Sequence, residues 1–225
     1  MENVKAKGHF TAVLIARQWL APGILEFRLQ RPSGFDFIPG QFVRFAMEGY
    51  QREYTMISEP GAATLDFCVA VEERGRFSNA IQDADIGAGF DFDGPLGHFV
   101  HQGPANPAVF VATGTGVAPF VAFFRSGVRG ALLLFGIGTP DRLIYKQVLQ
   151  AGVHACVACI SKEGAVDDDH AGRFPGRVTR YLETRLAPGV YDFYLCGRRA
   201  MIRDATAIID RRFEGSRLFI EAYND

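Results

Sequence analysis

A glycine-rich segment in the middle of the chain, Thr113-Gly114-Thr115-Gly116-Val117-Ala118-Pro119, has residue types suited to binding phosphate. It follows the apolar run Ala108–Ala112 and opens a helical pattern over Val117–Arg125. A loop in that position directs backbone N–H groups and the start of a helix toward an anion. Pro119 is compatible with a first helical turn, but it breaks the fingerprint G-x-G-x-x-G, and no acidic residue ends the next apolar run. The segment predicts a phosphate site, with an ordinary tight turn as the alternative.

A second candidate is Arg52-Glu53-Tyr54-Thr55. A guanidinium can pair with phosphate, a phenol ring offers a face for stacking, and a hydroxyl can bond a heteroaromatic nitrogen. Along a strand, Arg52 and Tyr54 lie on one face and Thr55 on the other. Taken alone, the four residues also fit a surface strand with a half-buried tyrosine.

Three further segments follow turns or apolar runs. In Gly75-Arg76-Phe77-Ser78, we expect Ser78 to cap a short helix over Asn79–Gln82 and to leave N–H groups free for a second phosphate. A plain capped helix is the alternative. Gly94-Pro95-Leu96-Gly97-His98-Phe99 indicates a turn. Cys196-Gly197-Arg198-Arg199-Ala200-Met201 follows an apolar run, which places Cys196 either at a ligand-binding strand end or in the core as a small buried residue.

The elements that must position these residues differ between the two halves of the chain. The first half has short alternating runs separated by turn signals, typical of an antiparallel barrel or sandwich: Leu25–Leu29, Phe42–Phe45 and Leu65–Val69. The second half has continuous apolar runs alternating with helical patterns, typical of a parallel sheet covered on both faces. The runs are Ala108–Ala112, Ala131–Phe135, His154–Ile160 and Tyr191–Leu195, and the helical patterns are Val117–Arg125, Leu143–Gln150, Val178–Arg185 and Ala200–Phe213. Prolines and a glycine within His101–Pro107 predict a linker, and hence domains over 1–103 and 104–225.

Composition narrows the class of protein. The 225 residues are 48% hydrophobic and 22% charged, with a formal net charge of −1. These values fit a globular protein that is not disordered, and they argue against nucleic acid or an anionic membrane as the main partner. The first twenty residues lack the apolar region of a signal peptide, and Ala108–Phe124 is too interrupted for a membrane span. Together with four cysteines, this leads us to expect a cytoplasmic protein.

Taken in order, these segments resemble the ferredoxin–NADP(+) reductase superfamily, and most of all the bacterial ferredoxin/flavodoxin–NADP(+) reductases. The resemblance implies an N-terminal antiparallel Greek-key β-barrel that binds flavin and a C-terminal α/β domain that binds a pyridine nucleotide. It implies that Arg52 binds the flavin phosphate, that Tyr54 stacks on the isoalloxazine, and that Thr55 lies near its reactive nitrogen. Gly75 and Ser78 would bind the pyrophosphate, and we place Val69 and Phe77 in the same flavin-binding set.

For the nucleotide, the resemblance implies a site made of the glycine loop and the cysteine segment. Its residues are Thr113, Gly114, Thr115, Gly116, Pro119, Cys196, Gly197 and Met201, with Cys196 beside the nicotinamide. In many relatives a glutamate and an aromatic ring near the end of the chain face the flavin, and Glu221 and Tyr223 look like that pair. Tyr223 either stacks on the flavin, flanks it, or is simply packed. The expected catalytic residues are Thr55, Cys196, Glu221 and Tyr223.

The choice between NADPH and NADH depends on cations that can bind a 2′-phosphate. Ser161-Lys162-Glu163, Arg173 and Gly176-Arg177 resemble the cationic segments of NADPH-using bacterial relatives. Lys162 keeps the charge but loses the guanidinium fork, and Glu163 weakens the argument. We expect NADPH, bound by Ser161, Lys162, Arg173 and Arg177.

Two patterns suggest metal or redox chemistry that we do not expect. Cys156 and Cys159 match C-x-x-C, but they lie in a predicted strand, where residues three apart point to opposite faces. Asp167-Asp168-Asp169-His170 is typical of a solvated loop. We therefore expect no metal site.

The chain also has no C-x4-C-x2-C run, so we expect no fused plant-type iron–sulfur domain. Electrons would then leave to a separate partner or to a small diffusible acceptor, and the resemblance implies a ferredoxin or flavodoxin-like carrier protein. Together with the resemblance, the sequence predicts a monomeric flavoprotein oxidoreductase that uses FAD and NADP(H). The alternatives are an NADH-dependent reductase component of a multicomponent oxygenase and a flavin-free binding subunit of the same fold.

Overall fold

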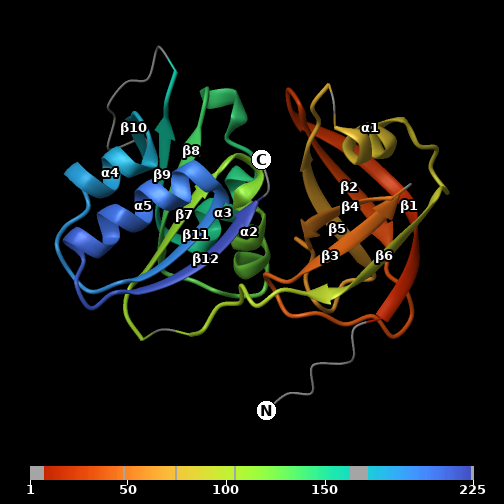
Figure 1. The fold of residues 1–225 in the computed structure, drawn as a ribbon, viewed down its shortest axis with the longest axis horizontal. Coiled ribbons are helices and arrows are strands. Elements are labelled where there is room, and N and C mark those ends of the chain that lie inside the picture. The colour runs from red at the N-terminus through yellow and green to blue at the C-terminus, as the bar shows by residue number, and fades with distance from the viewer. Residues whose placement is uncertain (1–7, 48, 74, 104, 163–171, 224–225) are drawn as a thin grey trace. The chain divides into compact units, whose positions relative to one another are not determined.

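The computed structural model describes residues 8–47, 49–73, 75–103, 105–162 and 172–223. The chain divides into two compact units, Met1–His101 and Gln102–Asp225 (Figure 1). The division lies two residues before the boundary predicted from the linker composition. Each unit is described by itself.

The first unit is an antiparallel barrel. Its strands are β1 (Gly8–Ala21), β2 (Ile24–Gln30), β3 (Phe42–Met47), β4 (Tyr50–Thr55), β5 (Thr64–Ala70) and β6 (Gly89–Leu96). Their order is β4-β3-β6-β1-β2-β5, with all neighbours antiparallel. A bridge between Met56 and Phe67 joins the two edges of this sheet. Because β3, β4 and β5 are neighbours and β6 returns beside β3, the topology is a Greek key, which confirms the predicted fold.

Phenylalanines fill the interior of the barrel. Phe27 and Phe67 stack with ring centroids 5.0 Å apart, and Phe45 lies 5.6 Å from Phe92. One helix, α1 (Arg76–Asp83), buries Phe77 against this cluster. The Arg17 guanidinium donates to the carbonyl of Ala84 at the end of α1, which satisfies a carbonyl that the helix leaves open.

The second unit is a parallel six-stranded sheet. Its strands are β7 (Ala108–Thr113), β8 (Ala131–Ile137), β9 (Val153–Ile160), β10 (Arg173–Pro175), β11 (Asp192–Arg198) and β12 (Arg217–Tyr223). The order is β10-β9-β8-β7-β11-β12, and all neighbours are parallel. The chain moves outward from β7 to β10 and then returns to β11 on the other side of β7. The strand order therefore reverses between β7 and β11, where open parallel sheets bind ligands at the carboxyl ends of their strands.

Helices cover both faces of this sheet, as the continuous apolar runs predicted (Figure 1). The helices are α2 (Ala118–Arg125), α3 (Lys146–Gly152), α4 (Val178–Thr184) and α5 (Arg199–Arg212). On one face Phe110 of β7 stacks on Phe120 of α2, with ring centroids 4.8 Å apart. On the other face Val111 and Leu195 belong to one buried cluster with Leu182 of α4 and residues of α5.

Helix starts account for three differences from the sequence predictions. The helix α1 begins at Arg76, three residues before the predicted Asn79. The helix predicted over Leu143–Gln150 begins only at Lys146, as α3, and a 3₁₀ turn, Pro140–Arg142, precedes the predicted stretch. Gly114–Val117 is likewise a 3₁₀ turn that leads into α2.

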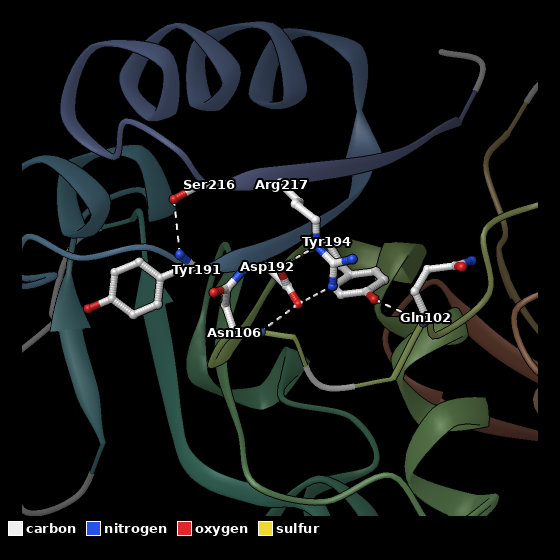
Figure 2. Close-up of polar contacts among 7 residues, drawn as sticks. All are labelled: Gln102, Asn106, Tyr191, Asp192, Tyr194, Ser216 and Arg217. Carbon is white, nitrogen blue, oxygen red and sulfur yellow. Dashed lines mark hydrogen bonds and ion pairs between the residues drawn. The ribbon is translucent and has the colours of Figure 1, made fainter.

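A buried carboxylate organises the amino end of the second sheet (Figure 2). Asp192, at the start of β11, is 1% exposed and accepts two hydrogen bonds from Arg217, at 2.8 and 2.5 Å. Asn106 donates its backbone and side-chain N–H groups to the same carboxylate. These bonds, above all those from Arg217, hold the pKa of Asp192 well below its usual range.

Tyr194 completes the cluster of Figure 2, because its hydroxyl accepts a hydrogen bond from the backbone of Gln102 at 3.1 Å. The first residues of the second unit are thereby tied to its sheet. Among the residues that the structure describes, no helix has the length and apolar character to cross a membrane.

Candidate functional site

An aromatic column runs from the barrel core to Tyr54 on β4. Phe77 of α1 is 3% exposed and lies 4.7 Å from Phe45, and Tyr54 stacks on Phe77 with ring centroids 5.2 Å apart and planes 29° apart. Tyr54 itself is only partly buried. Burial raises the pKa of its phenol to about 12, against a smaller lowering by the positive charge of Arg52. The column presents a neutral aromatic ring to which a planar ligand can be added by stacking.

The two faces of β4 separate the residues of the second sequence candidate. Tyr50, Arg52 and Tyr54 alternate with the exposed Gln51 and Glu53. Thr55 ends the strand opposite Phe42 of β3 and is 2% exposed. Arg52 and Tyr54 therefore share a face, as the strand period predicts.

Gly75 and Ser78 are linked directly at the start of α1. The Ser78 hydroxyl donates to the carbonyl of Gly75 at 3.2 Å, and a Cβ on Gly75 would collide with the Ser78 oxygen. Gly75 is the N-cap residue, and Ser78 is the third residue of the helix. The prediction that Ser78 caps a helix was therefore wrong, because the hydroxyl bonds backward to a carbonyl.

The N-terminus of α1 nevertheless stays open to an anion. Among the described residues, no side-chain cap hydrogen bond is made at the N-cap residue Gly75, and the first turn contains no acidic residue. The first N–H groups of a helix have no partner inside the helix and attract negative charge.

Tyr50 and Arg76, which the sequence analysis did not single out, lie beside this N-terminus. The Arg52 guanidinium carbon lies 3.9 Å from the centre of the Tyr50 ring, and that of Arg76 lies 5.9 Å from the same ring. The signal available in the sequence was the strand period, since Tyr50 shares the face of Arg52 and Tyr54. Val69, by contrast, is 2% exposed and contributes its side chain to the barrel core.

In the second unit, the glycine loop packs against the cysteine segment at the point where the strand order reverses. Thr113 ends β7, and its hydroxyl accepts a hydrogen bond from the backbone of Arg198 at 3.3 Å. A Cβ on Gly116 would lie 2.5 Å from the carbonyl oxygen of Cys196 and 2.7 Å from the Cα of Gly197. Only glycine fits at this close approach of two backbones.

The rest of the glycine loop follows the same edge of the sheet. Gly114 has φ +55°, Thr115 is partly buried, and Pro119 occupies the first turn of α2, as predicted. Met201 of α5 is partly buried and packs against the apolar cluster beneath that helix.

Cys196, Glu221 and Tyr223 lie together on adjacent strands. Cys196 pairs in register with Glu221, and Arg198 pairs with Tyr223. The thiol of Cys196 is completely buried, and burial raises its pKa well above the usual value. The Glu221 carboxylate raises this pKa further, while a hydrogen bond with the Tyr223 side chain lowers it. Cys196 is therefore a neutral thiol.

Three of the four residues expected to bind a 2′-phosphate follow the carboxyl ends of β9 and β10. The backbone N–H groups of Ser161 and Lys162 donate to Ile137 and Gly138 at 3.0 and 3.1 Å, which extends the pairing of β9 with β8. Arg177 is the N-cap residue of α4, and both Lys162 and Arg177 are exposed. Arg173 instead begins β10, at the opposite end of that strand.

Cys156 and Cys159 both lie within β9 and are free thiols. Burial raises their pKa values to about 11 and about 12. Over the described ranges, no three His, Cys, Asp or Glu side chains are grouped to hold a metal ion. Glu163 and Asp167–His170 lie outside the described residues.

Family models match each unit separately. Residues 20–101 match a model described as an oxidoreductase FAD-binding domain, and residues 110–207 match one described as an oxidoreductase NAD-binding domain. The first match covers the barrel with Tyr54 and α1. The second covers the sheet with the glycine loop and Cys196.

Relatives among the curated proteins include electron transfer components and reductases. The 2-halobenzoate 1,2-dioxygenase electron transfer component of Burkholderia cepacia is 29% identical over 181 residues, which cover 76% of this chain and 53% of that protein. Ferredoxin–NADP reductase B of Sorangium cellulosum is 32% identical over 155 residues, 63% of this chain and 64% of that protein. The chain thus spans between half and two thirds of the length of these relatives.

Solved structures share this fold over nearly all of the chain. A ferredoxin NADP+ reductase from Neisseria gonorrhoeae, with bound FAD and NADP, matches with a TM-score of 0.80 and 20% identity, over 95% of this chain and 98% of that one. The Amycolatopsis cytochrome P450 reductase GcoB matches with a TM-score of 0.83 and 23% identity, over 97% and 71%. At these identities the likeness shows the fold alone.

Proposed function

Because the chain belongs to the ferredoxin–NADP reductase superfamily and is a flavin oxidoreductase of that type, we propose that it transfers electrons between NADPH and a one-electron carrier protein, a ferredoxin or a flavodoxin, through FAD. The observation that carries this proposal is the close approach of the Gly116 and Cys196 backbones at the point where the strand order of the second sheet reverses. In the same chain, the barrel presents the Tyr54 ring for stacking. The first accommodates a nucleotide and the second a flavin.

In the flavin site, Tyr54 stacks on the isoalloxazine and Arg52 neutralises a phosphate. The open start of α1, at Gly75 and Ser78, donates backbone N–H groups to the pyrophosphate. Thr55 positions the ring edge from the end of β4. When FAD is bound, it supplies the ability to take two electrons from a nicotinamide and release them one at a time.

In the nucleotide site, Thr113 and the glycine loop hold the phosphates at the start of α2. Cys196 packs as a neutral thiol beside the nicotinamide and brings no charge to it. Beside Cys196, Glu221 supplies a polar group and Tyr223 an aromatic ring next to the place where electrons pass between the nicotinamide and the flavin.

The proposal that the nucleotide is NADPH rests on Lys162 and Arg177. Both side chains are exposed, and they follow the neighbouring strands β9 and β10. A 2′-phosphate bound there can contact two cations. Ser161 adds a hydroxyl on the same turn. Arg173 is the weakest of the four expected residues, because it begins β10 rather than ending it.

The visible spectrum tests this function directly. Purified protein, titrated anaerobically with NADPH, is expected to show flavin bands that bleach at low NADPH. A protein that takes up no flavin after addition of FAD contradicts the proposal. It also fails if Tyr54→Ala and Thr55→Ala leave both flavin occupancy and diaphorase rate unchanged.

A second candidate is an NADH-dependent reductase component of a multicomponent oxygenase. It is favoured by the curated relatives, which include electron transfer components of halobenzoate and toluate dioxygenases. The ratio of kcat/KM for NADPH and NADH separates the two, since a strong NADH preference would favour this candidate. A flavin-free binding subunit is the remaining alternative, and a colourless protein that ignores FAD would support it.

A further inference from the structure

One face of β11 and β12 carries a row of side-chain pairs that runs the length of both strands. Residues two apart along a strand share a face, and the two strands pair in register. From the amino to the carboxyl end, the pairs are Asp192 with Arg217, Tyr194 with Phe219, Cys196 with Glu221, and Arg198 with Tyr223. The second pair is stacked, with ring centroids 4.5 Å apart and planes 18° apart. The row therefore connects the buried carboxylate of Figure 2 to the carboxyl ends of the strands, where Glu221 and Tyr223 lie.

The position of β12 depends on its pairing with β11. It is the last strand in the sheet order, and in the described part of the chain it pairs with β11 alone. None of its seven residues is fully buried, and Ile220 is 45% exposed. Burial of one face strongly fixes the register of a strand, and β12 has no such face. A shift of one residue would turn Glu221 and Tyr223 to the opposite face of the sheet. Ile220 or Ala222 would then lie opposite Cys196.

The ion pair at the amino end favours one register. The Nε and Nη2 atoms of Arg217 donate to the two carboxylate oxygens of Asp192, and each oxygen also accepts a hydrogen bond from Asn106. Two parallel bonds from a planar guanidinium fix direction as well as distance. Two further bonds lie beside them (Figure 2): Arg217 donates its backbone N–H to the Tyr191 carbonyl, and Tyr191 donates its own to the Ser216 hydroxyl, both at 3.0 Å. In another register the carboxylate, which is 1% exposed, would lose its cation inside the protein, and that loss is strongly destabilising.

We propose that the pair of Asp192 and Arg217 fixes the register of β12 and thereby positions Glu221 and Tyr223 beside Cys196 for electron transfer at the nicotinamide. This role rests on the proposed function, which places these three groups at the transfer site. Asp192 lies four residues before Cys196, or about 13 Å along the strand, so the pair acts through the strand rather than on the reacting atoms. Asp192 and Arg217 are therefore positioning residues.

The test measures the full chain in two ways, of which the first needs no ligand. Arg217→Met removes the ion pair and keeps an apolar stem near the Phe219 ring, which the guanidinium carbon approaches to 5.4 Å. Amide hydrogen exchange over β12 is expected to become about tenfold faster or more, while β7 and β8 exchange as in the wild type. The diaphorase kcat, measured well below the thermal midpoint, is expected to fall about tenfold or more, because the transfer groups are misplaced. The KM for NADPH and the FAD content should stay near the wild-type values.

A double variant separates positioning from stability. Arg217→Met leaves a buried carboxylate without its cation and is expected to lower the thermal midpoint. Asp192→Asn combined with Arg217→Met removes both charges, so the thermal midpoint should recover in large part. The kcat of this double variant should stay low, because the strands still lack the ion pair. Arg217→Lys keeps the charge without the planar fork and should give an exchange rate and a kcat between those of the wild type and Arg217→Met.

The matched control is Arg211→Met, which breaks the exposed ion pair of Arg211 with Glu183 at 2.7 Å and is expected to change neither the exchange of β12 nor kcat. The positioning role is overturned if Arg217→Met leaves the exchange of β12 at the wild-type rate, or if the double variant recovers kcat together with its stability. It is also overturned if Arg211→Met has the same effects as Arg217→Met. Failure of the proposed function is a different result: the wild-type chain then shows no flavin that NADPH can bleach, whereas the exchange of β12 is still measured without a ligand.

Discussion

Gly116 meets the backbone of Cys196 so closely that a single methyl group on the glycine would lie 2.5 Å from the carbonyl oxygen of the cysteine. Gly116 lies in the turn that follows β7, and Cys196 lies near the carboxyl end of β11; the sheet order reverses between these two strands. The contact fixes the glycine loop against the cysteine segment, so that the two segments form one continuous surface.

Gly116→Ala is accordingly expected to weaken nucleotide binding. The added methyl must push two backbones apart, which we expect to destabilise the second unit by about 1–3 kcal/mol, as overpacking of a core does. The KM for NADPH rises while FAD content stays at the wild-type level. The control is Gly61→Ala in the barrel, where the added methyl meets nothing within 4 Å. An unchanged KM for Gly116→Ala would contradict the close approach.

Tyr54 is expected to act through its ring rather than its hydroxyl. Tyr54→Phe should bind FAD as the wild type does, whereas Tyr54→Ala should lose roughly tenfold in affinity, because a stacking surface is removed. Because the phenol pKa is about 12, FAD affinity should not change through this group between about pH 7 and pH 10. A titration of FAD affinity against pH in wild type and Tyr54→Phe checks this point.

Lys162 and Arg177 are expected to determine the preference for NADPH over NADH. Removing either charge, as Lys162→Ala or Arg177→Ala, should raise the KM for NADPH roughly tenfold and leave the KM for NADH nearly unchanged, because only NADPH carries the 2′-phosphate. Arg173→Ala is the comparison, since this residue begins β10, and we expect a smaller effect. Equal changes for both nucleotides would argue against the assignment.

Asp192 is expected to make the stability of the second unit depend on acid pH. Its pKa lies below that of the unfolded chain, about 4, so its contribution is fully present above about pH 4 and is lost as pH falls through the folded value. Asp192→Asn should lower the thermal midpoint at neutral pH and flatten its acid dependence. Asp204→Asn is the control, because Asp204 forms an exposed pair with Arg203.

The cysteines are expected to be slow to react in the folded protein. Burial raises the pKa values of Cys156, Cys159 and Cys196, and the thiolate is the reactive form. A thiol reagent at about pH 8 should label these three only after unfolding, and Cys156→Ser should keep full activity. Rapid labelling of Cys159 in the native protein would reopen a redox role for the C-x-x-C pattern.

Local pattern was sufficient to predict much of the fold. Alternation marked β2, β3 and β5, because one side of each strand faces the phenylalanine core. Continuous apolar runs marked β7, β8, β9 and β11, because helices cover both faces of the second sheet.

What the sequence could not predict depends on contacts between distant segments. The start of α1 was misjudged because both Gly75 and Ser78 suit an N-cap, and the choice between them depends on where the Ser78 hydroxyl turns. Arg76 and Tyr50 were missed because they meet only through the packing of α1 on β4. The burial of the Cys196 side chain likewise depends on the neighbouring strands β7 and β12, which come from distant parts of the sequence.

The strand order of the second sheet also has a consequence for how the chain folds during synthesis. All six barrel strands precede the second unit, so the flavin-binding part has its partners as soon as β6 is made. The central strand β7 has no partner on one side until β11 appears, after most of the second unit has been translated. The surface formed by Gly116 and Cys196 is therefore completed late in synthesis on the ribosome. A truncation before β11 would leave a complete barrel attached to a partial sheet with an open apolar edge.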